Sequence, residues 1–327
     1  MDWILVFISL PILFAVELIY FKIADKYNII DRPNERSSHK GIILRGGGII
    51  FYFSALYYFL AFHFPYPWFM LGLTIITAVS FIDDISSLSS KARVLLHFIA
   101  MVLMLVQWGL LGGGFPWWYV VIALIVCTGV INAYNFMDGI NGMTGAYSLS
   151  ILVALIYINS YQYPFIAPEF IYITIAGVMV FNFFNFRKKA RCFAGDVGAV
   201  SIAFIILFMV GRLIILTGNI SYIILLLLYG VDTILTLIHR IMLHEDIFHA
   251  HRKHAYQIMA NELKIPHLVV SLYYLTIQVL FLVGYFVLFK YCYTYLIASV
   301  ITLSILYILF MRKFFALHTL SEKARKQ

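Results

Sequence analysis

Long apolar stretches, each bounded by charged residues, proline or glycine, recur from one end of the chain to the other. A helix needs about 20 such residues to cross the hydrocarbon core of a bilayer. The pattern therefore predicts eleven membrane-spanning helices, at residues 3–21, 46–63, 68–82, 94–111, 117–132, 145–160, 169–186, 197–214, 220–238, 268–288 and 292–311. The third stretch is short enough to be buried or re-entrant, which would leave ten spans.

Composition agrees with this interpretation. Of the 327 residues, 63% are hydrophobic and only 12% are charged, whereas soluble proteins carry about 25% charged residues. The sequence lacks the short alternating segments of a membrane barrel. We therefore expect an all-α polytopic membrane protein with a single integral-membrane domain over residues 1–327. No small-residue cleavage site follows the first stretch, so we expect it to remain as a transmembrane helix.

The basic residues predict the orientation. With eleven spans, 21 of the 23 lysines and arginines fall on one side of the membrane, and the positive-inside rule makes that side cytoplasmic. The N-terminus is then outside and the C-terminus cytoplasmic. Topology accounts for the net charge of +8, so nucleic acid is not an expected partner. The predicted cytoplasmic connections are residues 22–45, 83–93, 133–144, 187–196 and 239–267.

Two polar segments fall on that side, where spans end. The first contains the adjacent carboxylates Asp83 and Asp84, whose repulsion favours a cation or a proton-transfer task, although Asp84 could instead cap the next helix. The second, NAYNFMDGINGM, places Asn132, Asn135 and Asp138 on one face if the fifth helix continues into it. These groups could bind hydroxyls, amides or the water shell of an ion. A plain turn rich in asparagine and aspartate is the alternative.

A third segment, FNFFNFRKKARCFAGDVGAV, carries Asn185, four basic residues and then Asp196 between two glycines. A carboxylate at the mouth of a span is well placed for a metal, and Mg2+ prefers one or two carboxylates together with substrate phosphates. The basic cluster alone is explained more simply by topology.

The segment HRIMLHEDIFHAHRKHAYQ contains five histidines. Zinc is disfavoured because there is no H-E-x-x-H pattern and no nearby cysteine. Together with Arg252 and Lys253, the histidines fit an anionic diphosphate better, and a solvated basic loop stays the alternative.

Three glycines and two carboxylates within the predicted spans also stand out. Gly46 to Gly48 are expected to permit close helix packing at the start of the second span. Glu17 and Asp232 lie within spans, where an ionisable side chain is a functional candidate by default, but the sequence assigns no role to either.

Carboxylates, carboxamides and a cationic connection at one side of a membrane bundle suit phosphoryl-type transfer, which relies on charge neutralisation. Five motifs, in their order, resemble the polyprenyl-phosphate N-acetylhexosamine-1-phosphate transferases (glycosyltransferase family 4): RPNERSSHKGIILRGGG, FIDDISSLSSKARVLLHF, NAYNFMDGINGM, FAGDVGAV and HAHRKHAYQ. The resemblance covers residues 31–257. It implies transfer of a sugar 1-phosphate from a UDP-sugar to undecaprenyl phosphate, with release of UMP. It further implies dependence on Mg2+, with Mn2+ as a substitute, and a site on the cytoplasmic face of a bacterial inner membrane.

The resemblance also implies roles for individual residues. Asp196 matches the principal Mg2+ ligand, and Asp83 and Asp84 match paired aspartates near the metal and the lipid phosphate, one of them a candidate base. Asp138 is the candidate nucleophile of a two-step route, whereas we favour direct attack of the lipid phosphate on the donor's β-phosphorus. Substrate-binding roles are implied for His39, Lys40, Asn132, Asn135, Asn141, Asn185, His251, Arg252 and His254.

Departures from the family's pattern bear on the substrate. Asn141 stands where the family often has a second aspartate, and HRKHAYQ differs from the multi-histidine form of the peptidoglycan enzyme. The latter pattern resembles branches that initiate O-antigen, capsule or glycan-anchor synthesis, so UDP-GlcNAc or a modified N-acetylhexosamine is the expected donor. Within the family, a phospho-N-acetylmuramoyl-pentapeptide transferase is the alternative. Outside it, an ion-coupled transporter would hold its carboxylates near the midplane. A homodimer is left open.

Overall fold

The computed structural model describes residues 2–31, 43–86, 88–246 and 252–326, and about four fifths of them are helical. Within these ranges the only strands are β1 (Ile30–Asp31) and β2 (Ile43–Leu44), which pair antiparallel. The chain is an all-α polytopic membrane protein, as expected. His39, Lys40 and His251 lie outside the described residues.

Ten helical segments of the described chain are long and apolar enough to cross a membrane. They are α1 (Trp3–Lys26), α3 (Pro67–Ile85), α4 (Ser90–Gln107), α5 (Trp117–Met137), α6 (Met143–Tyr161), α7 (Pro168–Asn185), α8 (Gly195–Thr217), η2 (Ile220–Leu226) with α9 (Leu227–Met242), α11 (His267–Val287), and η3 (Phe289–Tyr291) with α12 (Cys292–Lys326). A shorter apolar helix is formed by η1 (Gly47–Ile49) and α2 (Ile50–Ala61), and α10 (Ala255–Asn261) is a short connecting helix.

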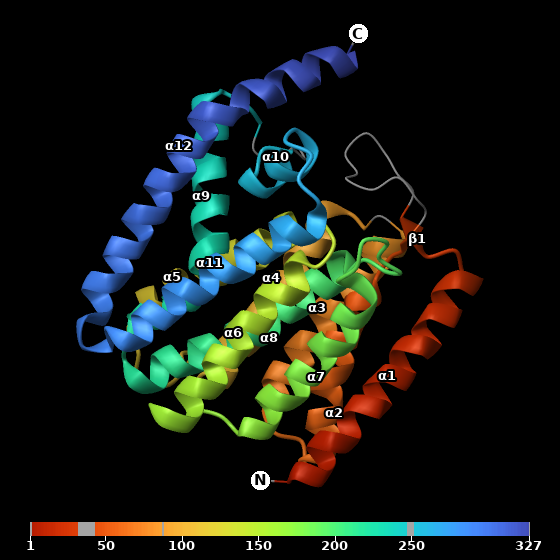
Figure 1. Cartoon of the computed structure of the whole chain (residues 1–327). Coiled ribbons are helices and arrows are strands. Elements are labelled where there is room, and N and C mark those ends of the chain that lie inside the picture. The colour runs from red at the N-terminus through yellow and green to blue at the C-terminus, as the bar shows by residue number, and fades with distance from the viewer. Residues whose placement is uncertain (1, 32–42, 87, 247–251, 327) are drawn as a thin grey trace.

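Each of the eleven predicted stretches corresponds to one of these apolar helices. The expectation that the third is the short one was wrong, because α3 has 19 residues and the second stretch is the shorter helix. The α3 helix continues through Asp83 and Asp84 because both carboxylates find partners at its end. The two ends of the chain lie at opposite ends of the bundle (Figure 1), which requires the shorter helix Gly47–Ala61 to count as an eleventh crossing beside the ten longer ones.

The centre of the bundle is α8. Every residue from Val197 to Val210 is buried, because α8 packs against α2, α3, α5 and α6. A helix that is apolar on all sides belongs in such a position.

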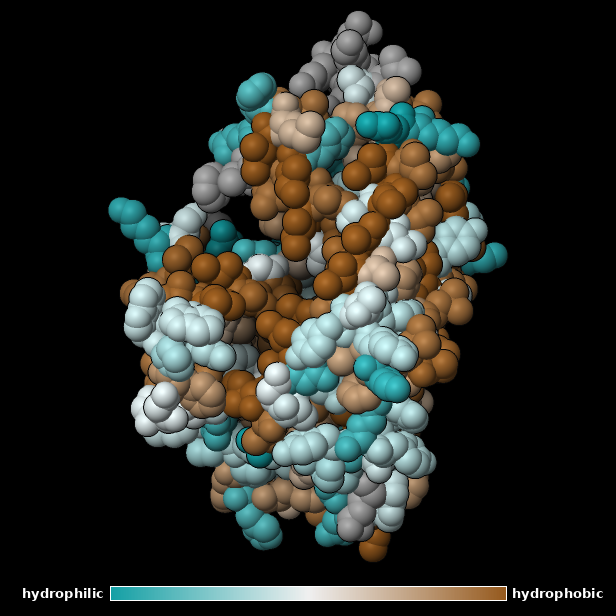
Figure 2. Space-filling model, turned by 90° about the vertical axis from the view of Figure 1, so that its left-hand side faces the viewer, coloured by the Kyte–Doolittle hydropathy of each residue, from teal (hydrophilic) through white to brown (hydrophobic). Residues whose placement is uncertain are grey.

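Outer helices face the surroundings with their apolar side chains. Exposed examples are Ile4, Phe7 and Ile19 on α1 and Ile297, Ile301, Ile305 and Leu309 on α12. Apolar residues also cover much of the face on which α12 lies (Figure 2). Such a surface is expected to contact lipid. Apolar side chains that face lipid do not have to be buried inside the protein.

The glycines at the start of the second apolar helix permit a close crossing, as predicted. A Cβ on Gly48 would lie 2.4 Å from the Cα of Gly198, so η1 and α8 touch backbone to backbone. A Cβ on Gly47 would lie 2.5 Å from the sulfur of Cys192 and 3.1 Å from the carboxyl of Glu17, which is fully buried. This crossing brings Arg45, just before the glycines, to the first turn of α8.

Candidate active site

Asp84 joins the end of α3 to the beginning of α8. Its carboxylate accepts hydrogen bonds from the backbone N–H groups of Asp196 (3.1 Å) and Val197 (3.0 Å). A carboxylate in this position satisfies the free N–H groups of a helix and complements its dipole. Asp84 therefore caps α8. The alternative that it caps the next helix is wrong, because Ser89 caps α4 by accepting from the N–H of Ala92.

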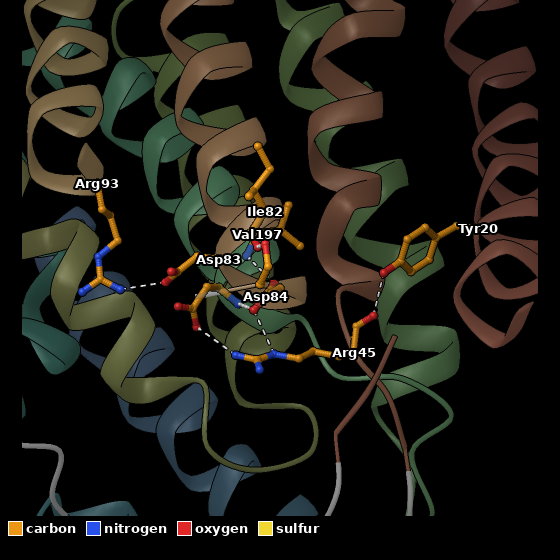
Figure 3. A network of polar contacts seen from close by, with 9 residues as sticks. Tyr20, Arg45, Ile82, Asp83, Asp84, Arg93 and Val197 are labelled. Carbon is orange, nitrogen blue, oxygen red and sulfur yellow. Dashed lines mark hydrogen bonds and ion pairs between the residues drawn. The ribbon is translucent and has the colours of Figure 1, made fainter. Parts of the chain in front are cut away.

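Arg45 supplies the positive charge at this junction. Its Nε lies 2.8 Å from Oδ1 of Asp84, and its Nη2 lies 3.8 Å from Oδ1 of Asp196. The hydroxyl of Tyr20 on α1 donates to the carbonyl of Arg45 at 2.6 Å and fixes the backbone that presents the guanidinium (Figure 3). The side chain of Asp84 is fully buried, whereas about a third of the Arg45 and Asp196 side chains is exposed.

Asp83 points away from Asp84 because adjacent helical residues are about 100° apart around the axis. Its Oδ1 accepts from the N–H of Leu88 at 2.9 Å, and its Oδ2 lies 2.7 Å from Nη1 of Arg93 on α4 (Figure 3). Each carboxylate thus has its own arginine, and the two do not converge on one shared cation.

Gly195 is required where three segments meet. Its φ is +71°, and a Cβ there would lie 2.6 Å from Oδ2 of Asp84 and 3.0 Å from the backbone nitrogen of Gly46. Both the left-handed conformation and the close approach exclude a side chain. The G-D pair of the FAGDVGAV motif thereby places Asp196 beside Asp84.

The α5 helix continues to Met137, so the condition under which Asn132, Asn135 and Asp138 share one face is met. Asn132 is exposed, whereas the carboxamide of Asn135 lies beside the carboxylate of Asp196 and favours its charged form. Asp138 is the C-cap of α5, and its Oδ1 accepts from the hydroxyl of Thr144 at 2.6 Å. The structure therefore brings two of these three residues to the junction.

Asp138 is electrostatically unusual. Burial, together with the charges of Asp196 and Asp84, raises the pKa of Asp138 to about 8, against the opposing effects of Thr144 and Arg45. Three carboxylates and one arginine thus influence one another at this end of the bundle. A site of this kind attracts cations and can exchange a proton near neutral pH.

Two carboxamides predicted to bind substrate tie loops together. Asn141 donates from Nδ2 to the backbone carbonyl of Arg187 at 2.9 Å. Asn185 accepts from the N–H of Gly142 at 2.6 Å and donates to the carbonyl of Cys192 at 2.8 Å. The two side chains hold the basic segment 186–194 against the Asp138 segment. Only Oδ1 of Asn141, which is buried and makes no hydrogen bond with the described residues, is left for another group.

His254 is almost fully buried at the start of α10, and its Nδ1 lies 3.1 Å from Oδ1 of Asp232. Arg252, two residues earlier, is half-buried. Tyr256 follows and donates from its hydroxyl to the carbonyl of Phe136 at 2.8 Å. The 239–267 connection thus reaches the Asp138 segment through α10.

The donors at the junction suit Mg2+ better than zinc. Among the described residues, no three His, Cys, Asp or Glu side chains form a ready metal site, although His249 and His251 lie outside them. Asp196 offers a partly exposed carboxylate beside the carboxamide of Asn135. Oxygen donors of this kind fit an ion that takes one or two carboxylates and completes its shell with water and substrate phosphates.

Sequence reasoning missed the cations and hydroxyls that support the carboxylates. Arg45 and Arg93 lie in two of the motifs named above, in the stretches LRGGG and SSKAR. Their positive charges are explained there by the orientation of the chain in the membrane and not by a role in the site. Thr144 and Tyr256 carry no sequence signal for their contacts with Asp138 and Phe136, because these contacts depend on how the helices pack.

Part of the chain that holds this site matches a known protein family. Residues 66–217, which hold α3 to α8, match the family model described as glycosyl transferase family 4. This match, which covers slightly less than half of the chain, shows a similarity to glycosyl transferase family 4 over α3 to α8. The matched part of the chain contains Asp83, Asp84, Asp138 and Asp196, whereas Arg45 and His254 lie outside it.

Several curated proteins that the chain resembles share one activity name. An undecaprenyl-phosphate alpha-N-acetylglucosaminyl 1-phosphate transferase from Yersinia pestis is 28% identical over 200 residues, which are 56% of this chain and 55% of the relative. The protein of the same name from Escherichia coli O157:H7 is 26% identical over 60% of this chain and 59% of its own. A probable undecaprenyl-phosphate N-acetylglucosaminyl 1-phosphate transferase from Bacillus subtilis is 24% identical with the same coverage. The matches therefore span less than two thirds of these relatives.

Proposed function

We propose that this protein transfers an N-acetylhexosamine 1-phosphate, in the first instance GlcNAc-1-phosphate, from a UDP-sugar to undecaprenyl phosphate. The products are UMP and a lipid-linked sugar diphosphate that starts a surface glycan. The observation that carries the proposal is the junction of Asp84, Asp196, Asp138 and Arg45 at one end of a membrane bundle. The names of the relatives supply the reaction class. The positive-inside pattern supports a location of this end at the cytoplasmic face, and the bacterial relatives support a bacterial inner membrane.

In the proposed reaction, an oxygen of the lipid phosphate attacks the β-phosphorus of the donor. The new P–O bond forms as the bond from that phosphorus to the oxygen bridging the two phosphates breaks, and UMP leaves with the electron pair. A phosphate monoester has its second pKa near 6, so the acceptor is mostly a dianion at neutral pH. The carboxylates then need not remove its proton. Their task is to position cations around the reacting groups.

Positive charge at the reaction centre would come from two sources. Arg45 lies between Asp84 and Asp196 and would neutralise phosphate oxygens that approach from the exposed side. Asp196, with Asn135 beside it, would hold Mg2+, which when bound would polarise the donor diphosphate. Asp84, fully buried and bonded to three groups, would keep Arg45 and the start of α8 in place.

The position of the carboxylates speaks against the transporter alternative. Asp83 and Asp84 end α3, Asp138 follows α5 and Asp196 begins α8, so all four lie at helix ends. Coupling ions of secondary transporters are usually bound near the midplane.

The test uses purified protein in nanodiscs with undecaprenyl phosphate, Mg2+ and a panel of UDP-sugars, and follows UMP release. Asp196→Asn is expected to reduce release at least 100-fold, whereas the control Asp25→Asn, at an exposed end of α1, should leave it unchanged. Release that requires the lipid and depends on Asp196 supports the proposal. No release from any donor by folded wild-type protein would overturn it.

A further inference from the structure

Asp232 is a buried carboxylate that the proposed reaction does not use. It lies in α9 and is 3% exposed, yet it is bonded by groups from three helices. Its Oδ1 accepts from Thr236 on its own helix (3.1 Å), lies 3.1 Å from Nδ1 of His254, and accepts from the N–H of Ala255 (3.4 Å). Its Oδ2 accepts from the hydroxyl of Tyr274 on α11.

These contacts make Asp232 the anchor of α10. A seven-residue helix is too short to be stable by itself, and its first turn is bonded to Asp232 through both the His254 ring and the Ala255 N–H. The hydroxyls of Thr236 and Tyr307 are 2.7 Å apart and extend the network to α12. The position of α10 beside α9 and α12 is visible in Figure 1.

The far side of α10 touches the active-site segment. Tyr256 is fully buried and donates to the carbonyl of Phe136. Its ring also lies over Gly139, where a Cβ would come within 2.2 Å of the Tyr256 hydroxyl oxygen. Phe136 and Gly139 flank Asp138 on both sides. The backbone that carries Asp138 is therefore fixed to α10, and α10 is fixed to Asp232.

We propose that Asp232 is a positioning residue, which sets the place of Asp138 through His254, α10 and Tyr256 without touching the reacting groups. This inference rests on the proposed function for its catalytic consequence, but its structural consequence can be measured independently. Displacement of a reacting group by about 1 Å can lower turnover 100-fold.

The hydrogen bonds of Asp232 determine which variants test this proposal. Asp232→Ala removes all four contacts, whereas Asp232→Asn keeps an acceptor oxygen for the three groups that meet Oδ1, so it is expected to preserve the anchor. The matched control is Glu262→Ala. Glu262, the C-cap of α10, is bonded to Nδ1 of His318 on α12 at 3.0 Å, and both side chains are nearly buried. This second buried His–carboxylate pair holds the other end of α10 against α12.

The experiment is hydrogen–deuterium exchange of the full chain in nanodiscs, followed in peptides that cover residues 135–143. Asp232→Ala should raise exchange there several-fold, and Asp232→Asn and Glu262→Ala should leave it at the wild-type level. Turnover of Asp232→Ala should fall about 10- to 100-fold. If Asp232→Ala does not fold, His254→Ala, which releases α10 from the other side of the same bond, should raise exchange in the same peptides.

Unchanged exchange at 135–143 in folded Asp232→Ala, or an equal rise in Glu262→Ala, would overturn the inference. Hydrogen exchange needs no substrate. The positioning role of Asp232 can therefore be tested even if the wild-type protein transfers no sugar phosphate. Failure of the proposed function and failure of the positioning role are thus distinguishable.

Discussion

Gly195→Ala tests whether the junction of α3, α8 and the Arg45 segment is as tight as described. Gly195 has a φ of +71°, and its substitution places a Cβ 2.6 Å from Oδ2 of Asp84. An alanine in the left-handed conformation costs about 1–2 kcal/mol. The carboxylate must also retreat by roughly 0.8 Å to reach an ordinary 3.4 Å contact, and overpacking of this kind adds about 1–3 kcal/mol. We expect a total loss of about 2–5 kcal/mol.

Gly218→Ala is the matched control at the other end of the same helix. Its φ is +65°, but a Cβ there would meet nothing within 4 Å, so only the conformational cost of about 1–2 kcal/mol applies. Unfolding would be followed by tryptophan fluorescence in detergent, and turnover by UMP release. Gly195→Ala should lose more stability than Gly218→Ala and about 10- to 100-fold in turnover because Asp84 moves, whereas Gly218→Ala should keep its turnover. Equal stability and turnover of the two variants would refute this geometry.

Three further predictions concern the Asn141 hydrogen bond, the protonation of Asp138 and the divalent metal. Asn141→Asp replaces the donor to the Arg187 carbonyl with a carboxylate and should lower stability by about 1–3 kcal/mol in unfolding experiments; an unchanged midpoint would contradict the loop contact. The pKa of Asp138 is raised from 3.8 to about 8, so its protonated form stabilises the fold at low pH and that contribution is lost as pH rises through 8. Without divalent metal, wild type should therefore lose stability relative to Asp138→Asn between about pH 4 and 8. Stability profiles that run parallel across this range would contradict the raised pKa of Asp138. Chelation of divalent ions should abolish UMP release and added Mg2+ should restore it, while release that persists in EDTA would exclude the metal.

Hydropathy alone predicted the number and order of the apolar helices, because lipid-facing side chains on helices such as α1 and α12 leave long uninterrupted runs in the sequence. It placed helix ends less well. The α3 and α5 helices continue to Ile85 and Met137, past polar residues at which a span was expected to stop. Those polar groups remain helical because Asp83, Asp84 and Asn135 find partners on other helices, and such partners cannot be read from local sequence.

The sequence singled out the carboxylates of this junction, but it did not show which groups hold each of them. Asp83 and Asp84 are neighbours in sequence, yet their positions on a helix send them to different arginines. Asn141 and Asn185 were expected to bind substrate, and their donors instead bond backbone carbonyls of the 186–194 segment. A carboxamide can form hydrogen bonds with a ligand or with the backbone of a loop. The sequence therefore does not tell which bonds it forms, and the fold is needed. Arg45 was counted as a topological charge because its partners lie far away along the chain.

The most direct test of the account is the product itself. Purified wild-type protein in nanodiscs would be incubated with UDP-GlcNAc, undecaprenyl phosphate and Mg2+, and the lipid fraction analysed by mass spectrometry. The account predicts undecaprenyl diphosphate bearing one N-acetylhexosamine, formed in equal amount to UMP and missing with Asp196→Asn. A lipid fraction that holds only undecaprenyl phosphate, for this and every other UDP-N-acetylhexosamine, would contradict it.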